Sequence, residues 1–286
     1  MKRMAVLLLA LFAGPLAACG SDAQTSGTRV VASFYPYAYV AEQVGGAHVD
    51  VDNLTSPGVE PHDVELKPRQ VGAIQGADLI VYQRGFQSAV DDAVDQADLP
   101  SDDVLDVAKT VKEGHDDPHT WLDPTTMITV AHAVEERLAK TDPDHASDFA
   151  ANTRRLEREL TRLDTAFADG VKTCRTRTIV TSHAAFHYLA ERYRLTQVPI
   201  AGIDPTNEPT PSQLADISAL VKREGITTIF TEELVSPAIA DTVARETGAR
   251  TATLDPIEGL GDNDGGTYLS LMKRNLDAIR TANGCS

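Results

Sequence analysis

The chain alternates short β-branched apolar runs with longer stretches in which apolar residues recur every three or four positions. In the first half, the pattern predicts strands over 29–34, 48–54, 78–83 and 103–108, and helices over 68–77 and 86–97. In the second half, it predicts strands over 177–182, 197–203, 227–232 and 250–255, and helices near 184–193, 211–224, 237–247 and 268–282. Such alternation is typical of parallel α/β units. We therefore predict an α/β fold of two lobes, each a parallel β-sheet flanked by helices.

The longest helical pattern lies between these halves. After Asp142-Pro143 there is no Gly or Pro until Gly170, and the apolar residues that follow trace one helix face: Phe149, Leu156, Leu160, Leu163, Phe167 and Val171. A helix of roughly 27 residues would reach about 40 Å. We expect one long linking helix over 143–171, with an N-terminal lobe at 29–142 and a C-terminal lobe at 172–286. An ordinary helix within one domain is the alternative, which this length disfavours.

The first residues have the three regions of a bacterial secretion signal. Lys2 and Arg3 form a basic start, Ala5 to Ala13 an apolar run too short for a stable membrane span, and Leu16-Ala17-Ala18-Cys19 a small-residue cleavage region. The segment resembles a lipobox, which implies a signal peptide at 1–18, cleavage before Cys19 and lipidation of its sulfur. Residues 19–28 are then a polar, lipidated tether. A plain secretory signal with a chance cysteine is the alternative.

Charge narrows the classes of partner. Removing residues 1–18 takes away two basic residues and no acid, so the formal net charge moves from −16 to −18. Nucleic acid binding is disfavoured because it requires a basic surface. Of 286 residues, 268 remain after cleavage, which is enough for two modest domains with their own cores. No later apolar run approaches the length of a transmembrane helix.

Two cysteines remain after Cys19 is assigned to lipid. Outside the cytoplasm, Cys174 and Cys285 are most simply a disulfide, which would join the start of the second lobe to the last turn of the chain. Free thiols and metal ligation are the alternatives.

Candidate chemistry lies at the ends of predicted strands. His62 stands between a strand and the helix begun by Pro68, His119 precedes the helix begun by Pro124, and His183 follows strand 177–182. Asp255 ends strand 250–255. In parallel α/β folds, the carboxyl ends of the strands open into the crevice where ligands bind. Three imidazoles and one carboxylate from the two lobes would make a four-coordinate set suited to zinc in this crevice.

The remaining histidines are expected to be structural or exposed: His48, His115, His132, His145 and His187. His115 lies four positions before His119, a spacing that many helical metal sites use, but Pro118 disfavours a helix there. We therefore interpret His115 as part of an exposed turn. Glu60 could offer a spare oxygen two residues before His62, but Pro61 is expected to aim it elsewhere, so it is left out of the ligand set.

Several stretches together resemble one family over residues 29 to 280. The chain resembles the cluster A-I solute-binding proteins, the metal-binding lipoproteins that serve ATP-driven zinc and manganese importers. The matching stretches are "VVASFYPYAYVAEQVGG", "PHDVELKP", "DPHTWLDP", "TSHAAFHYLAERYRL", "TEELVSP", "TLDPIEGL" and "GDNDGGTYLSLMKRNLDAI". The resemblance implies two lobes joined by one long helix, with the metal in the interlobe cleft. Position by position, it implies the ligands His62, His119, His183 and Asp255.

The resemblance also implies a function without catalysis. Manganese members resemble this sequence with Glu at the position of His183, and imidazole suits zinc, so three histidines favour Zn²⁺, with Mn²⁺ as the alternative. The implied protein is a monomeric, extracytoplasmic receptor, lipid-anchored to the bacterial membrane, that delivers Zn²⁺ to an ABC transporter permease. A zinc hydrolase is disfavoured because a closed four-ligand set lacks an open position for water and no H-E-x-x-H motif occurs. A surface adhesin is also disfavoured, because that function would not explain the combination of His62, His119, His183 and Asp255.

Overall fold

The computed structural model describes residues 27–111, 117–261 and 265–286. The expected signal peptide at 1–18, Cys19, most of the tether and His115 lie outside the described residues. Within the described ranges, no helix combines the length and the apolar character that crossing a bilayer requires.

The N-terminal lobe contains a four-stranded parallel sheet in the order β2-β1-β3-β4. Its strands are β1 (Thr28–Ala32), β2 (Val49–Asn53), β3 (Leu79–Tyr82) and β4 (Val104–Asp106). Its helices are α1 (Tyr35–Gly45), α2 (Pro68–Gln75), α3 (Ser88–Ala97), α4 (Val107–Val111) and α5 (Pro124–Thr141). Short 3₁₀ turns η1 (Gly46–His48), η2 (Pro61–Asp63), η3 (Ser101–Asp103) and η4 (Thr120–Leu122) interrupt the connections.

The C-terminal lobe repeats this arrangement with the strand order β6-β5-β7-β8, again all parallel. Its strands are β5 (Thr178–Thr181), β6 (Thr196–Pro199), β7 (Thr228–Thr231) and β8 (Arg250–Thr253). Its helices are α7 (His187–Tyr193), α8 (Pro211–Glu224), α9 (Ala238–Thr247) and α10 (Tyr268–Asn283). The predicted fold class of two parallel α/β lobes is confirmed.

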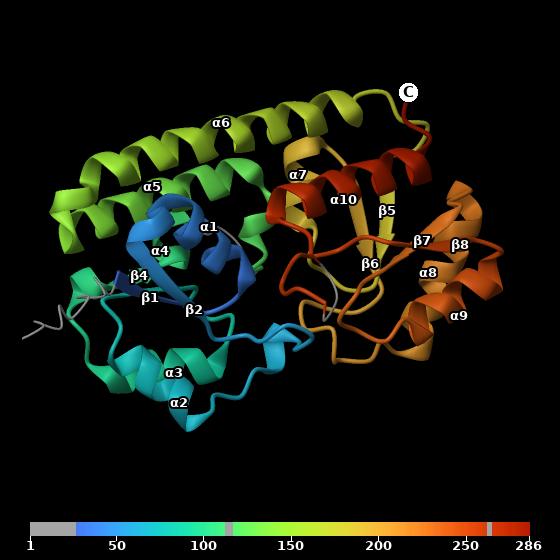
Figure 1. Cartoon of the computed structure of the whole chain (residues 1–286). Coiled ribbons are helices and arrows are strands. Elements are labelled where there is room, and N and C mark those ends of the chain that lie inside the picture. The colour runs from blue at the N-terminus through green and yellow to red at the C-terminus, as the bar shows by residue number, and fades with distance from the viewer. Residues whose placement is uncertain (1–26, 112–116, 262–264) are drawn as a thin grey trace, which may run out of the picture.

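Helix α6 (Ala146–Gly170) is the long helix between the lobes, and it follows the 3₁₀ turn η5 (Pro143–His145). Its buried face is the predicted one, with Phe149, Leu156, Leu160, Leu163 and Phe167 all excluded from water. Figure 1 shows α6 running along the top of the molecule over both lobes, with α10 beneath its C-terminal half. The helix therefore spans the junction between the two sheets.

Two helices of the N-terminal lobe, α1 and α4, were absent from the sequence prediction, which placed a strand over 103–108 where β4 ends and α4 begins. Helix α1 buries nine of its eleven residues, so it shows no polar face and no amphipathic period. Its second residue is Pro36, a position where proline costs a helix nothing because that N–H has no helical partner. The sequence pattern therefore did not predict α1, because its aromatic residues and proline are buried on almost every side of the helix.

The largest hydrophobic core crosses the boundary between the lobes. It joins α1 and α5 of the first lobe to α7 and α10 of the second, with α6 packed along both. Trp121 lies at the crossing: its indole N–H donates to the carbonyl of Pro256 at 2.7 Å, and its own carbonyl accepts from Tyr268 Oη at 2.6 Å. Two smaller cores lie beyond the sheets, one in each lobe. The lobes thus share a continuous interior rather than meeting across a polar gap.

A disulfide closes the far end of the second lobe. Cys174, just after α6, is bonded to Cys285, 111 residues later, as expected from the sequence. The backbone supports the same closure, since Ser286 N–H donates to the carbonyl of Thr173 at 3.0 Å. The end of the chain is therefore fixed beside the end of the linking helix.

Candidate metal centre

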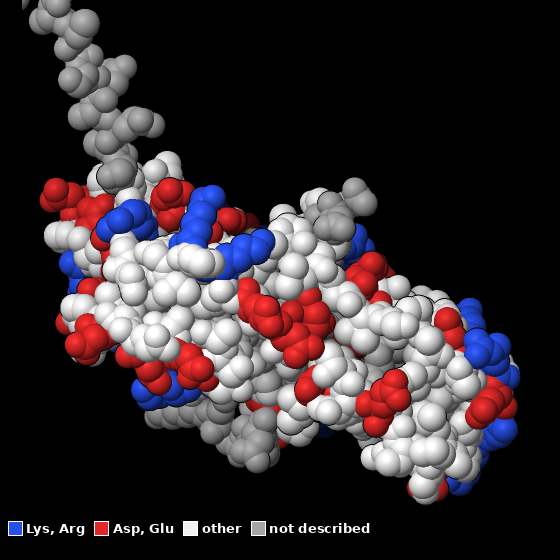
Figure 2. Space-filling model, turned by 90° about the horizontal axis from the view of Figure 1, so that it is seen from below, with Lys and Arg blue, Asp and Glu red and all other residues white. Residues whose placement is uncertain are grey.

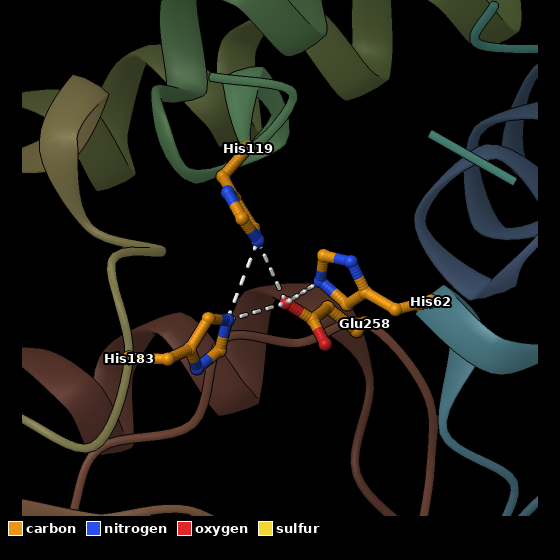
Figure 3. Close-up of side chains that lie close together, drawn as sticks. All are labelled: His62, His119, His183 and Glu258. Atoms are coloured by element: carbon orange, nitrogen blue, oxygen red, sulfur yellow. Dashed lines mark hydrogen bonds and ion pairs between the residues drawn. The ribbon is translucent and has the colours of Figure 1, made fainter. Parts of the chain in front are cut away.

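Four side chains from both lobes converge between the sheets. His62, His119, His183 and Glu258 each offer one ligand atom, and these four atoms all lie within 4.8 Å of one another. Figure 3 shows the three imidazoles and the carboxylate pointing toward one common point. Two of the four come from the N-terminal lobe and two from the C-terminal lobe, so the cluster lies at the lobe interface.

The spacing of these atoms fits a four-coordinate ion. Glu258 Oε1 lies 3.6 Å from His62 Nε2, 3.0 Å from His119 Nε2 and 3.2 Å from His183 Nε2. The Nε2 atoms of His119 and His183 are 3.4 Å apart. A tetrahedron with metal–ligand bonds of about 2.1 Å has edges of about 3.4 Å. These four donor-donor distances thus lie close to the edge length that a tetrahedral ion requires.

His62 is presented by the η2 turn between β2 and α2. Glu60 caps this turn, because its Oε1 accepts from the backbone N–H of His62 at 3.1 Å. Phe86 packs edge-on against the imidazole with ring centroids 4.7 Å apart. As expected, Glu60 stays outside the four-atom cluster, but it lies close enough to act on it electrostatically.

His119 is fixed by the acid two residues before it. Asp117 Oδ1 accepts from the backbone N–H of His119 at 3.0 Å and from its ring Nδ1 at 2.6 Å. The carbonyl of Pro118, between them, accepts from Gln83 Nε2 at 2.6 Å, so the loop is held against β3. With Nδ1 carrying the proton for Asp117, Nε2 is left as a free lone pair directed at the cluster. The imidazole is completely buried.

His183 is held in the same way from the other lobe. It follows β5, and its Nδ1 lies 2.9 Å from Glu232 Oε2, at the end of β7. Its carbonyl accepts from Thr181 Oγ1 at 2.7 Å, which fixes the backbone where the strand ends. Both side chains are almost fully buried. A carboxylate behind the ring again sets the tautomer that leaves Nε2 available to an ion.

The fourth position corrects the sequence prediction. Asp255 is not part of the cluster, because its Oδ1 accepts from the backbone N–H of Ile257 at 2.7 Å and shapes the turn after β8. Its backbone is clamped to α10, where Asn275 bonds both its N–H and its carbonyl. Ile257 adopts a φ of +56°, a rare conformation for a β-branched residue. This tight turn directs Glu258, three residues after Asp255, into the site.

The sequence contained a signal that favoured Glu258 over Asp255 as the fourth ligand. The stretch Asp255-Pro256-Ile257-Glu258 ends a strand, and an Asp that begins a turn bonds the backbone two residues later. That role occupies the carboxylate of Asp255, so the next acid was the stronger candidate for a ligand.

The electrostatics of the cluster reflect buried charges that stabilise one another. Burial alone lowers the pKa of His183, but its hydrogen bonds to Glu232 and Glu258 outweigh this and raise the pKa to about 10. Burial alone would raise the pKa of Glu258, but hydrogen bonds from the three histidines hold it well below its usual range. Burial, together with the negative charge of Glu258, raises the pKa of Glu60 to about 8. When no metal is bound, protons on the histidines therefore supply the positive charge that the buried carboxylates attract.

The other described histidines have ordinary roles, as expected. His48 lies 3.1 Å from Asp148 and stacks on His145 with ring centroids 3.9 Å apart. His132 lies within 3.6 Å of Glu135 and within 3.4 Å of Glu157 on the surface. None of these residues belongs to the metal-ligand cluster found among the described residues.

Fold and site together define a two-lobed binding protein with one metal centre at the lobe interface. The family described as "ZnuA: Zinc-uptake complex component A periplasmic" matches residues 30–282. The chain therefore belongs to the ZnuA family.

Individual relatives agree with this assignment. The zinc-binding lipoprotein AdcA of Streptococcus pneumoniae is 34% identical over 310 residues, which cover 98% of this chain and 61% of AdcA. The chain thus spans about three fifths of that longer relative. The high-affinity zinc uptake system protein ZnuA of Bacillus subtilis is 32% identical, covering 93% of this chain and 92% of that protein. The crystal structure of the Zn(II)-bound ZnuA-like domain of AdcA superimposes with a TM-score of 0.79 at 33% identity, over 90% of this chain and 99% of that domain.

Proposed function

We propose that this chain is an extracytoplasmic receptor that captures Zn²⁺ and delivers it to an ABC-type permease for import. The observation that carries the proposal is the cluster of His62, His119, His183 and Glu258, whose ligand atoms stand at tetrahedral spacing between the lobes. The AdcA and ZnuA relatives, whose names specify zinc binding and zinc uptake, support the same reading. We further propose that the receptor is a monomer anchored by lipid at Cys19.

The donor set favours zinc over manganese. Three neutral imidazoles and one carboxylate suit Zn²⁺, whereas Mn²⁺ prefers a larger share of oxygen ligands. Asp117 and Glu232 strengthen this preference because they hold two imidazoles in the tautomer that presents Nε2. We expect Zn²⁺ to displace Mn²⁺ when both are offered at equal concentration.

The same geometry argues against hydrolysis. A catalytic zinc keeps three protein ligands and one open position for water, whereas here a fourth protein ligand closes the set. Glu258, the residue that closes it, is buried, and its Oε1 lies within 3.6 Å of the Nε2 atom of each imidazole. We therefore propose a binding role rather than an enzymatic one.

Calorimetric titration of the purified chain with zinc tests this proposal. One ion per chain should bind tightly without turnover of ester or peptide substrates. His183→Ala should weaken zinc binding at least a hundredfold, since it removes a ligand and leaves Glu232 buried without its partner. His132→Ala is the matched control, because His132 is an exposed histidine outside the cluster. Unchanged zinc binding by His183→Ala, or hydrolysis by the purified protein, would contradict the proposal.

A transport measurement tests the second half of the proposal. Cells that lack this chain should grow slowly when a chelator limits zinc, and added zinc should restore growth. A copy that carries Glu258→Gln should fail to restore growth in the chelator, whereas the unmodified copy should succeed. If both copies restored growth equally, the role of the chain in zinc-limited growth would not depend on its metal centre, which would contradict the proposal.

A further inference from the structure

The exposed face of α6 carries a row of arginines that the metal centre does not use. Arg154, Arg158 and Arg162 follow one another at intervals of four residues and are all exposed. Residues spaced by four lie on one helix face, and eight residues of helix extend about 12 Å. Together with Glu157 and Thr161, they line a shallow depression on the outside of the helix. We call these three residues the arginine row.

Three acidic residues of α6 make their ion pairs with other elements of the fold. Glu157 lies 3.4 Å from His132 on α5, and Asp164 lies 2.7 Å from Arg192 on α7. Asp148, in the first turn, lies 3.1 Å from His48. The ion pairs of these three acids are thus all made with neighbouring elements and none with the arginine row.

The arginines themselves form no ion pair within the part of the fold that the structure describes. Among the described residues, no ion pair engages Arg154, Arg158 or Arg162. Three arginines without an ion pair on one face, beside the single acid Glu157, are unexpected in a chain with a formal net charge of −16. The row is therefore a local reversal of the overall charge of the protein.

The chain enters the fold beside this helix. A Cβ on Gly27 would lie 2.7 Å from the carbonyl oxygen of His48, so the first described residue packs against η1. The imidazole of His48 in turn contacts Asp148 in the first turn of α6. The arginine row begins six residues further along the helix, about 9 Å away, and ends about 21 Å away.

A lipid on Cys19 would bring this face within reach of the membrane. Eight residues separate Cys19 from Gly27, and a fully extended chain of that length spans at most about 28 Å. The whole arginine row lies within that distance of the point where the tether joins the fold. This step rests on the proposed lipid anchor and is independent of the identity of the metal.

We propose that the arginine row docks the receptor on the anionic phospholipid headgroups of the membrane to which it is tethered. Arginines pair with phosphate through two parallel N–H groups, and a basic row near an anionic bilayer is attracted within about a Debye length. Figure 1 shows α6 on the top of the molecule, and Figure 2 shows the opposite face, where acidic side chains gather at the centre. Docking through α6 turns that acidic face away from the bilayer.

This orientation suits the capture step. The acidic face would point toward the external solution, where it attracts cations, while the bilayer repels it. Delivery to a permease would then require the tethered receptor to leave the bilayer surface and turn over. The attraction at the row is weak enough for such release, because each arginine contributes about a fivefold change in the surface-bound population.

Vesicle binding tests the proposal without depending on natural lipidation. The chain 19–286 keeps every described element, and Cys19→Ser removes the lipid site. At low salt, this chain should bind vesicles that contain 30% phosphatidylglycerol and should not bind pure phosphatidylcholine vesicles, as measured by co-sedimentation. Replacing all three arginines by glutamine should lower the partition coefficient about a hundredfold.

The matched control removes three cations elsewhere. Lys222→Gln, Arg223→Gln and Arg245→Gln change the net charge equally, but these residues lie on α8 and α9, at the far end of the second lobe. This variant should bind like the parent chain or somewhat more weakly. Equal loss of binding in both triple variants, or no preference for phosphatidylglycerol, would overturn the proposal.

A second measurement reports orientation. The two remaining natural cysteines form the disulfide, so a polarity-sensitive dye can be attached to a single introduced cysteine, Thr161→Cys beside the row or Ser236→Cys in the β7–α9 connection. Only the dye at 161 should shift its emission on phosphatidylglycerol vesicles. A larger shift at 236 would overturn the proposal. Mass spectrometry of the native protein separately tests the lipid on Cys19, and zinc titration of the arginine variants should be unchanged.

Discussion

Protons and zinc should compete for His183, and this competition sets a steep pH dependence. Its hydrogen bonds to Glu232 and Glu258 raise the pKa of His183 to about 10, so at pH 7 only about one molecule in a thousand carries the neutral imidazole. Zinc binds only the neutral form, and each ion must therefore displace a proton. The apparent zinc affinity should rise about tenfold per pH unit from pH 7 to 8.5, which amounts to about thirtyfold.

Replacing Glu232 isolates the cause of this slope. Glu232→Gln keeps an acceptor behind Nδ1 but removes its charge, so the pKa of His183 should fall toward its ordinary value of 6.5. The zinc affinity of the variant should then depend less on pH, so the ratio of parent affinity to variant affinity should rise by up to about tenfold per pH unit. Loss of the carboxylate that orients the imidazole typically costs ten- to hundredfold and acts in the opposite direction, so near pH 8.5 the parent and the variant should bind zinc with comparable affinity.

Competition with a chromophoric zinc chelator between pH 6.5 and 8.5 measures these affinities. Titrations in buffers of different ionisation heat count the protons released. Glu135→Gln is the control, since Glu135 contacts only an exposed histidine outside the site. The reasoning fails if the parent affinity changes less than threefold between pH 7 and 8.5, or if Glu232→Gln leaves the slope intact.

Three further predictions follow from the contacts around the site. Glu258→Gln should weaken zinc binding more than a hundredfold in chelator competition. Asp255→Ala should chiefly lower the unfolding temperature, because Asp255 shapes a turn. A larger loss of zinc affinity in Asp255→Ala than in Glu258→Gln would indicate that Asp255 is the ligand. Trp121→Phe should cost about 1–3 kcal/mol in urea unfolding, since it leaves a buried carbonyl of the other lobe unpaired; an unchanged midpoint would contradict this. Cys174→Ser with Cys285→Ser should cost about 3–5 kcal/mol under oxidising conditions, because the bond closes a 111-residue loop, and added reductant should remove this difference.

Strong local signals explain why most of the fold was predictable. Helices α5 and α8 begin at prolines preceded by Asp123 and Thr210, whose side chains cap the helices by accepting from the backbone. The three histidines were predictable because the carboxyl ends of parallel strands meet at one crevice. The structure brings Glu258 rather than the predicted Asp255 to the cluster, because a turn with a positive φ at Ile257 decides which acid faces it. Such a turn depends on packing against α10, which periodicity does not reveal.

Second-sphere contacts were also beyond the sequence. Glu232 lies 49 residues from His183, and no spacing connects the two. Asp117, in contrast, stands two residues before His119, and this pair could have been recognised as an acid that bonds the backbone two positions later.

The hydrophobic core that the two lobes share limits how a metal ion can enter and leave the site. Separating the lobes as rigid bodies would break the bonds of Trp121 to Pro256 and Tyr268 and expose the core that α6 covers. Because two buried hydrogen bonds and much of this core would be lost together, we expect no wide clamshell opening when an ion enters or leaves. His62 sits on a three-residue turn and, among the described residues, has no carboxylate behind its ring. We expect exchange to proceed by local displacement of that turn, so small-angle scattering should record almost the same radius of gyration with and without zinc.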